Sequence, residues 1–323
     1  MPAGLSSGLR VWRRDVVGMR LRDTTRRVQA GAGRPVACAN VSPKGNPPPP
    51  PDPLPAPVVD SHAHLDACGF RTPALVASAL DRAERAGVHK VVTVADDLAS
   101  ARWVAQAVDW DERLYGAVAL HPTRTAAFDQ ETRAELETLA SNSRVVAIGE
   151  TGLDYYWDYS PRAAQREAFD WHIDLAKRLK KPLMIHDRNA HDDVLDALDE
   201  NGPPAKVVFH CFSGDKEMAR RCAENGYVMS FAGPVTFRNA RELREAARTV
   251  PAELLLVETD APFLAPHPFR GRPNEPYCVA YTLRDLAALR GDDAAELANS
   301  VTANAERVFG FTVSARLVTP SDR

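Results

Sequence analysis

The sequence of 323 residues has no apolar run that approaches the roughly 18 residues needed to cross a membrane. It also begins without the apolar segment of a secretory signal peptide. The five cysteines are odd in number and scattered, with no C-x-x-C pair, which argues against a disulfide framework. These absences predict a cytoplasmic protein with reduced thiols and no membrane partner.

Most of the chain is also short of positive charge. Eight Arg and one Lys against three Asp give residues 1–57 a net charge of +6, so the remainder carries −9 of the total −3. An acidic body argues against broad electrostatic capture of nucleic acid. We expect a phosphate-containing substrate to be held by local arginines or by metal ions.

Residues 1–57 differ in composition from the rest of the chain. They are rich in arginine, then small and polar, and they end in five consecutive prolines at positions 47–51. A proline run favours polyproline II and cannot continue a helix or a central strand. We predict a disordered extension over 1–57. An amphipathic targeting peptide is the alternative, which Asp15 and Asp23 weaken.

From Val58 onward, short apolar runs alternate with amphipathic segments of helical length. The predicted strands cover 58–64, 89–95, 114–120, 145–150, 182–186, 206–211, 227–231 and 254–259. The predicted helices cover 73–87, 98–110, 129–141, 160–180, 190–200, 215–225, 238–249 and 277–290. Eight strands, each followed by a helix, predict an α/β fold, the (β/α)8 TIM barrel, over 58–311 with a tail at 312–323. A doubly wound open sheet is the competitor, but no glycine-rich phosphate turn comes after the first strand.

Histidines and carboxylates gather where the predicted strands end. His62 and His64 end the first strand and project to the same side, because alternate strand residues share a face. Other strands end at His121, Glu150, His186, His210 and Asp260. The active site of a barrel lies at the carboxyl ends of its strands. We therefore expect these side chains to meet in one cavity.

This set of side chains is larger than one tetrahedral metal site needs. It suits two divalent ions that share a bridging carboxylate, and Mg²⁺, Mn²⁺ and Zn²⁺ are all compatible. We assign His62, His64 and Asp260 to one ion, His186 and His210 to the other, and Glu150 between the two. Two such ions can hold a phosphate ester and lower the pKa of a water molecule. Asp260 is the natural general base to take the proton of that water.

Several neighbouring residues are compatible with more than one role. His121 precedes a proline and either contacts the substrate or only lines the cavity. Asp154 is an N-cap or a partner of a ligand, with catalysis less favoured. Arg188 comes two residues after His186 and can point toward the same cavity mouth. His172 lies in the middle of a predicted helix, where packing or surface exposure is expected.

The loop after the last predicted strand, residues 265–276, is long and stiffened by prolines. It carries Arg270 and Arg272, and arginine is suited to bidentate contact with phosphate. We include these two residues and Asn274 of the same loop among the candidate substrate contacts. A charged surface loop without a substrate role is the alternative.

The sequence resembles the TatD family of metal-dependent deoxyribonucleases over about residues 58–311. Six motifs occur in the family's order: 62-HAHLD-66, 149-GETGLDY-155, 185-IHDR-188, 210-HCFSG-214, 258-ETDAP-262 and 270-RGRPNEP-276. The resemblance implies a TIM-barrel metallohydrolase of the amidohydrolase-like group that acts on DNA ends. The family's metal positions fall on His62, His64, Glu150, His186, His210 and Asp260. The sequence departs from the family in its 57-residue extension, and in Asp187 and Asn189 around Arg188.

These residues are compatible with three classes of function. The leading hypothesis is exonuclease-like hydrolysis of single-stranded or frayed DNA by a monomer that uses two metal ions. The second is hydrolysis of a small amide or lactone, although the fourth strand offers Glu150 and no lysine that could be carbamylated. The third is a binding protein without catalysis, which has no need of six convergent ligands.

Overall fold

The computed structural model describes residues 44–157 and 159–313. Its strands are β1 (Val58–Ala63), β2 (Val88–Val94), β3 (Leu114–Val118), β4 (Val145–Asp154), β5 (Leu183–Arg188), β6 (Val207–Phe209), β7 (Val228–Phe231) and β8 (Leu255–Val257). Its α-helices are α1 (Pro73–Arg85), α2 (Leu98–Ala107), α3 (Gln130–Ala140), α4 (Arg162–Leu179), α5 (His191–Asn201), α6 (Lys216–Glu224), α7 (Arg241–Thr249), α8 (Val279–Arg290) and α9 (Ala294–Phe309). Short 3₁₀ turns are η1 (Pro122–Ala127), η2 (Gly233–Thr236), η3 (Ala252–Leu254) and η4 (Pro276–Cys278). No helix in these ranges has the length and apolarity of a membrane span.

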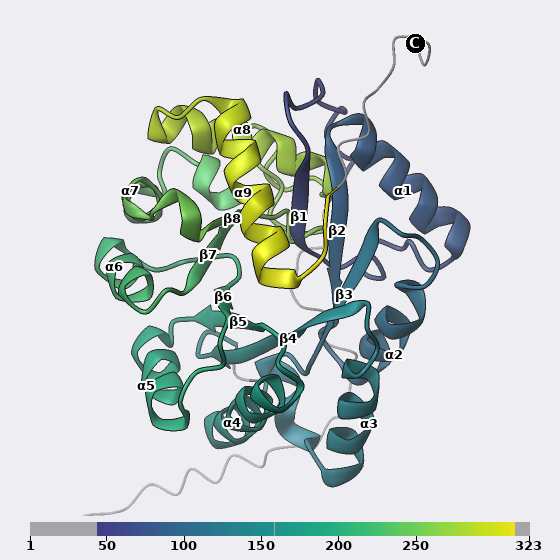
Figure 1. Cartoon of the computed structure of the whole chain (residues 1–323), viewed down its shortest axis with the longest axis vertical. Coiled ribbons are helices and arrows are strands. Elements are labelled where there is room, and N and C mark those ends of the chain that lie inside the picture. The colour runs from purple at the N-terminus through teal and green to yellow at the C-terminus, as the bar shows by residue number, and fades with distance from the viewer. Residues whose placement is uncertain (1–43, 158, 314–323) are drawn as a thin grey trace, which may run out of the picture. The chain divides into compact units, whose positions relative to one another are not determined.

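The strands form one parallel sheet in the order β1 to β8, and each strand pairs with the next along the chain. Helices alternate with the strands, and Figure 1 shows α1 to α7 arranged around the outside of the sheet. The first and last strands also meet, through a bridge between Ala63 and Ala261. This contact distinguishes the sheet from an open one and confirms the predicted (β/α)8 TIM barrel.

The barrel closes near the carboxyl ends of β1 and β8 through what we call the closure seam, residues 60–64 and 257–261. The backbone N–H of Asp260 donates to the carbonyl of His62 at 2.9 Å, and that of His64 donates to Ala261 at 2.7 Å. Asp60 accepts hydrogen bonds from the backbone and hydroxyl of Thr259 at 2.8 and 2.6 Å. Closure therefore takes place at the predicted metal ligands.

Alternate strand residues face two different apolar clusters. Val59 of β1 belongs to a cluster with inward-facing residues of the seven other strands, while its neighbour Val58 packs in the layer between strands and helices. Strands that are apolar on both faces are typical of a buried parallel sheet. Val308 and Phe309 of α9 join the inner cluster, so this helix covers one end of the barrel. Helix α9 was not among the helices predicted from the sequence.

Residues 44–57 correct the predicted disordered extension, because they form a strap along the barrel. Leu54 is buried in the main core, and its N–H donates to Ala86. The hydroxyls of Tyr277 and Tyr281 donate to the carbonyls of Pro48 and Pro49 at 2.6 and 2.8 Å. A polyproline segment satisfies none of its carbonyls internally, which leaves them free for such donors. The rest of the predicted extension, 1–43, lies outside the described residues, as do residues 314–323 of the predicted tail.

Removal of the strap is expected to lower stability. A chain that begins at Val58 should melt roughly 5–10 °C below a chain that begins at Lys44, because it lacks buried Leu54 and several hydrogen bonds worth about 1 kcal/mol each. Differential scanning calorimetry of the two truncated chains measures this difference. Equal melting temperatures would show that the strap contributes nothing to the fold.

His172 in α4 is a buried packing residue. Its Nδ1 lies 2.7 Å from the carbonyl of Ala168, and its Nε2 accepts the N–H of Leu120. Its ring stacks on Phe128, with centroids 5.4 Å apart. Burial lowers the pKa of His172 from 6.5 to about 4. The ring therefore stays neutral in the folded protein at neutral pH, which agrees with packing, one of the two roles expected for it.

The lowered pKa of His172 makes stability depend on pH. The unfolded chain takes up a proton near pH 6.5, whereas the folded chain resists protonation down to about pH 4. The contribution is thus complete above pH 6.5, and about 3 kcal/mol is lost as pH falls to 4. Urea unfolding of His172→Gln and of the unaltered protein should show a shallower acid loss in the variant. Parallel pH curves would contradict this account.

Candidate metal centre

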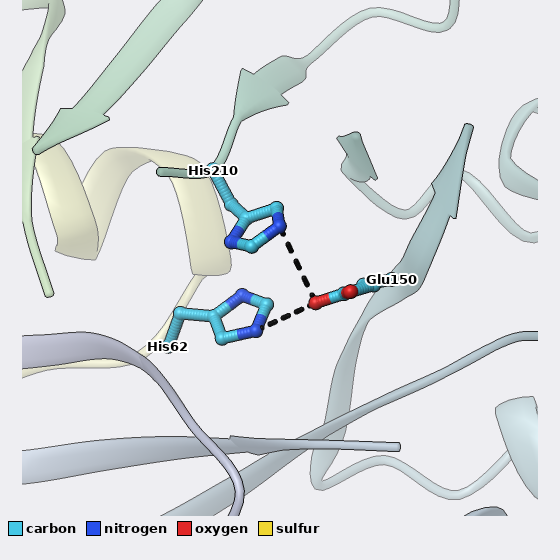
Figure 2. Close-up of side chains that lie close together, drawn as sticks. All are labelled: His62, Glu150 and His210. Carbon is cyan, nitrogen blue, oxygen red and sulfur yellow. Dashed lines mark ion pairs between the residues drawn. The ribbon is translucent and has the colours of Figure 1, made fainter. Parts of the chain in front are cut away.

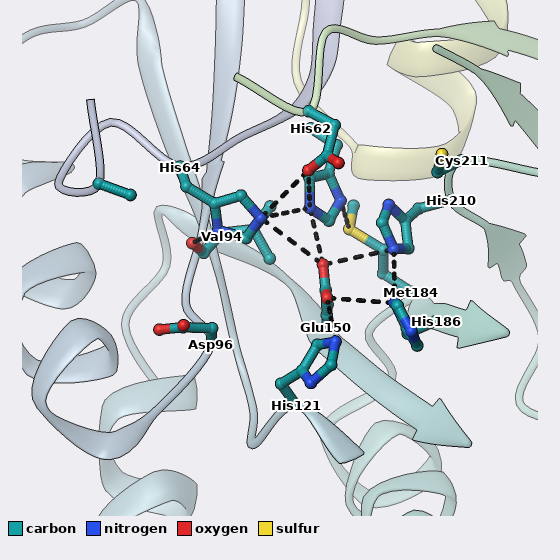
Figure 3. A network of polar contacts seen from close by, with 12 residues as sticks. His62, His64, Val94, Asp96, His121, Glu150, Met184, His186, His210 and Cys211 are labelled. Carbon is teal, nitrogen blue, oxygen red and sulfur yellow. Dashed lines mark hydrogen bonds and ion pairs between the residues drawn. The ribbon is translucent and has the colours of Figure 1, made fainter. Parts of the chain in front are cut away.

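The six predicted ligands lie together at the carboxyl ends of the barrel strands. Figure 3 shows the rings of His62, His64, His186 and His210 placed around the carboxylate of Glu150. All six side chains are buried or nearly so, although they are charged or polar. They come from β1, β4 and β5 and from the residues just beyond β1, β6 and β8. The structure therefore brings together every residue that was assigned to a metal ion.

Local backbone features explain how β4 delivers Glu150. Gly152 has a φ of +141°, and a Cβ atom there would lie 2.0 Å from the carbonyl oxygen of His186. Only glycine permits this close approach, which keeps β4 paired with β5 as far as Asp154 and Arg188. As a result, Glu150 Oε1 lies 3.4 Å from Nδ1 of His186 on the neighbouring strand.

Glu150 occupies the middle of the cluster. Its Oε2 lies 2.8 Å from Nε2 of His62 and 3.3 Å from Nε2 of His210, and Figure 2 shows both rings directed at this carboxylate. The His62 and His210 rings are stacked, with centroids 4.0 Å apart. The other carboxylate oxygen of Glu150, Oε1, faces His121 and His186. One carboxylate thus reaches both halves of the site.

Asp260 approaches the first histidine pair. Its Oδ1 lies 3.3 Å from Nε2 of His64 and 3.8 Å from Nε2 of His62. The residue has a φ of +53°, a left-handed conformation that costs energy for most residues other than glycine. The closure seam holds it there through the hydrogen bond to His62. Strain of this kind is common at functional sites.

The geometry of these donors fits divalent ions. Two ligands of one tetrahedral Zn²⁺ are about 3.3 Å apart, given Zn–N bonds of about 2.05 Å. The Nε2 atoms of His62 and His64 are 3.2 Å apart, and Nδ1 of His186 is 3.3 Å from Nε2 of His210. Glu150 Oε2 is buried without a hydrogen bond, although it lies close to two ring nitrogens. A buried oxygen without a hydrogen bond among converging nitrogens is typical of a cation site.

The second ring nitrogen of each of the four ligand histidines has a partner of its own. For His62 this partner is the sulfur of Met184, which lies 3.1 Å from Nδ1. For the other three it is an oxygen atom. Nδ1 of His64 lies 2.8 Å from the carbonyl of Val94, and Nε2 of His186 lies 3.0 Å from Asp154. Nδ1 of His210 lies 3.3 Å from Glu258, which is fully buried. Such partners orient metal-binding imidazoles.

The role of Asp154 was predicted from the sequence, whereas that of Glu258 was not. Asp154 is the partner of a ligand, which was one of the two roles favoured for it. Glu258 was missed, although it precedes Asp260 by two residues at the end of the last strand. That position was the signal that could have identified it.

The pKa values reflect a buried, negatively charged site. Burial alone would lower the pKa of His64, but the hydrogen bond to Asp260 and the charge of Glu150 outweigh it and raise it to about 10. Burial is likewise outweighed at His186 by Asp154 and Glu150, which raise its pKa to about 9. Glu150 itself would be raised by burial, yet His210 and His121 hold its pKa well below the usual value. A cation that binds here competes with the protons on these rings.

His121 contacts Glu150 and not the open mouth of the cavity. Its Nδ1 accepts the N–H of Thr123 at 3.1 Å, so the neutral ring carries its proton on Nε2. That Nε2 lies 3.0 Å from Glu150 Oε1 and donates to it. Burial lowers the pKa of His121 to about 4, which keeps the ring neutral. We therefore interpret His121 as the residue that positions Glu150, which is closer to the predicted lining of the cavity than to the predicted contact with substrate.

The three arginines that were predicted to contact substrate are all exposed. Arg188 is exposed at the end of β5, two residues beyond His186. Arg270 and Arg272 are exposed and lie over the rings of Phe237 and Phe269. None of the described polar contacts connects these two arginines with the six ligands. They remain candidates for contact with an extended substrate.

Asn274 has a different role from the one predicted. It is buried, and its amide nitrogen donates to the carbonyls of Thr259 and Phe263 at 2.9 and 2.7 Å. Both amide hydrogens are thus used within the protein. Asn274 thus stabilises the turn that contains Asp260, and its side chain has no N–H left to donate to a substrate.

Comparison with known proteins agrees with this geometry. The family model for TatD related DNase matches residues 59–310. A metal-dependent hydrolase TatD of Mycobacterium tuberculosis is 57% identical over 259 residues, which cover 79% of this chain and 98% of the relative. A protein of Erwinia tasmaniensis named 3′-5′ ssDNA/RNA exonuclease TatD is 35% identical over 239 residues, which cover 72% of this chain and 92% of the relative.

A solved structure shows the same barrel. The crystal structure of YjjV, a TatD homologue from Escherichia coli, superimposes with a TM-score of 0.73 at 30% identity. The match covers 79% of this chain and 98% of that chain. The barrel, the convergent ligands and the extent of these matches lead to one conclusion: the chain belongs to the TatD family of metal-dependent hydrolases.

Proposed function

We propose that this protein is a metal-dependent nuclease that hydrolyses phosphodiester bonds at the ends of single-stranded DNA. The observation that carries the proposal is the carboxylate of Glu150, which lies between the His62 and His210 rings on one side and faces His186 on the other. Two divalent ions that share a carboxylate are suited to in-line displacement at phosphorus. The relative named as a single-strand exonuclease supports the substrate class.

The ligand residues and Arg188 would have separate tasks. His62, His64 and Asp260, whose ligand atoms lie close together, would hold one ion. His186 and His210, with ring nitrogens 3.3 Å apart, would hold the other, and Glu150 would contact both. When bound, the ions would supply the positive charge that activates a water molecule and stabilises the leaving oxygen. Asp260 would accept the proton of the attacking water. Arg188 would hold a phosphate of the strand at the cavity mouth.

A metal-reconstitution screen tests the proposal. The metal-free protein would be loaded with Mg²⁺, Mn²⁺ or Zn²⁺ and offered single-stranded DNA, blunt and frayed duplexes, single-stranded RNA, a cyclic amide and a lactone. We expect metal-dependent release of nucleotides that is fastest with single-stranded DNA. Turnover of the amide or the lactone without any release of nucleotides would replace the nuclease with the second hydrolase class.

A further inference from the structure

We propose that Tyr156, Trp157 and Tyr159, together with Arg188, form a platform on which bases of a single-stranded nucleic acid stack beside the metal centre. We call these four residues the aromatic platform. The proposal rests on the proposed nuclease function and adds how the strand is recognised. Nothing in the ligand set requires these rings, since none of them belongs to the metal centre.

The rings of the platform are unusually open to solvent. Tyr156 and Tyr159 are 55% and 39% exposed, and among the described residues only Leu75 and Leu264 are comparably exposed large apolar side chains. Trp157, which lies between them in the sequence, is half-buried. Its ring is nearly parallel to that of Tyr159 at 9° and nearly perpendicular to that of Tyr156 at 89°. A cluster of exposed aromatic rings beside an active site indicates a binding surface.

Arg188 adds positive charge to this surface. Its guanidinium carbon lies 4.1 Å from the ring centre of Tyr156 and 5.7 Å from that of Trp157. Within residues 44–157 and 159–313, Arg188 makes no ion pair. A guanidinium that stacks on a ring through its face keeps its N–H edge free for a phosphate. Arg188 also lies two residues beyond the ligand His186 on β5, so both side chains leave the same side of the strand.

One carboxylate connects the aromatic platform with the metal centre. Oδ2 of Asp154 lies 3.0 Å from Nε2 of His186. Oδ1 of the same residue accepts the backbone N–H groups of Tyr156 and Trp157, each at 2.9 Å. Asp154 is buried, so these bonds fix the start of the aromatic loop relative to a metal ligand. The backbone of Tyr156 and Trp157 is therefore connected through a single side chain to the candidate ligand His186.

The chemistry of the platform favours a single strand over other occupants. A nucleic acid strand alternates phosphates, which suit Arg188, with flat bases, which suit exposed aromatic rings. In a duplex the bases are already stacked and offer no free face, whereas stacking on protein rings is available to a single strand. The part of the chain after residue 57 carries a net charge of −9. Local stacking can supply binding energy that this acidic body does not provide.

Paired substrates with and without bases test the proposal. We would compare an oligonucleotide with a strand of equal length built from abasic nucleotides, which keeps every phosphate. Simultaneous Tyr156→Ala and Tyr159→Ala should raise the KM of the base-containing strand roughly tenfold or more, because each stacked base contributes about 1–3 kcal/mol. The KM of the abasic strand should change by less than about twofold. Arg188→Ala should raise the KM of both strands, since both retain phosphates.

Simultaneous Tyr156→Phe and Tyr159→Phe is the matched control, because it keeps the rings and removes only the hydroxyls. This variant should behave like the unaltered protein with both strands. Equal effects of the alanine substitutions on the KM of the two strands would overturn base stacking. Base stacking would also be overturned if the alanine variant changed its oligomeric state in sedimentation while the KM of both strands stayed the same.

A binding measurement separates this proposal from the nuclease proposal. Fluorescence anisotropy of a labelled strand would be measured with Asp260→Asn, alone and combined with the alanine substitutions. If no strand is hydrolysed by the unaltered protein, the nuclease function fails, and weaker binding after ring removal would still support the aromatic platform. If strands are hydrolysed but ring removal leaves binding unchanged, the aromatic platform fails and the nuclease function stands.

Discussion

Asp260→Asn is expected to reduce metal-dependent hydrolysis of single-stranded DNA by about 10²–10⁴-fold, which is the usual contribution of a general acid–base group. The substitution removes the carboxylate that would accept the proton of the attacking water. It also weakens the first ligand set, because Asp260 Oδ1 is the carboxylate oxygen that accompanies His62 and His64. The loss should appear in kcat in single-turnover and steady-state measurements.

Asparagine is the suitable replacement because the backbone at this position is left-handed. Asp260 has a φ of +53°, and asparagine tolerates this region better than most residues. The closure seam hydrogen bond from its N–H to His62 does not involve the side chain and should persist. The melting temperature should therefore stay close to that of the unaltered protein. The exposed Asp109 provides the matched control, since Asp109→Asn should leave both rate and stability unchanged.

An active Asp260→Asn protein would show that another group accepts the proton. If kcat falls by less than tenfold while the metal content is unchanged, Asp260 does not take the proton of the water. The assignment of the general base would then be wrong, although the ligand geometry around Glu150 would be unaffected.

Glu150→Gln is expected to weaken metal binding by more than 100-fold and to abolish hydrolysis. Its carboxylate is buried among five imidazoles, and the amide would replace one charged oxygen by an NH₂ group. That group has no acceptor to offer a cation. A buried ligand site that loses its central negative charge also loses much of its attraction for divalent ions.

Metal analysis after dialysis and isothermal titration calorimetry measure this effect. If the unaltered protein binds two ions, as proposed, we expect the variant to retain at most one. Glu217→Gln, on the exposed face of α6, is the control and should bind metal normally. Two tightly held ions in the Glu150→Gln protein would show that this carboxylate does not join the two halves of the site.

The fold and the convergence of the six candidate ligands could be predicted because both depend on local patterns. Eight apolar runs separated by helical segments specify a barrel, and a barrel brings the ends of its strands to one face. His62 and His64 needed only the two-residue period of a strand to be placed together. The remaining candidate ligands lie within or just beyond the carboxyl halves of four other strands, so the barrel topology brings them to the same face.

The strap could not be predicted because its stabilising partners are distant in sequence. Prolines 47–51 offer no N–H groups and no apolar period, which indicates disorder when the segment is considered alone. Their carbonyls bind Tyr277 and Tyr281, more than two hundred residues away. The roles of His121 and Asn274 were missed for a related reason. The role of His121 depends on which of its atoms face Glu150, and that of Asn274 depends on which of its atoms face the backbone near Asp260. A sequence motif specifies only that these residues lie near the site.

The closure seam also constrains the order in which the molecule can acquire its site. Asp60 and Thr259 are separated by 199 positions, so their contact restricts almost the whole chain and costs more loop entropy than the pairing of neighbouring strands. We expect the first and last strands to join late, after the intervening strand and helix units have formed. Because the same few residues hold Asp260 beside His62, a partly folded chain lacks the complete ligand cluster. Amide exchange at His64 and Asp260 would therefore report the moment at which the complete ligand cluster forms.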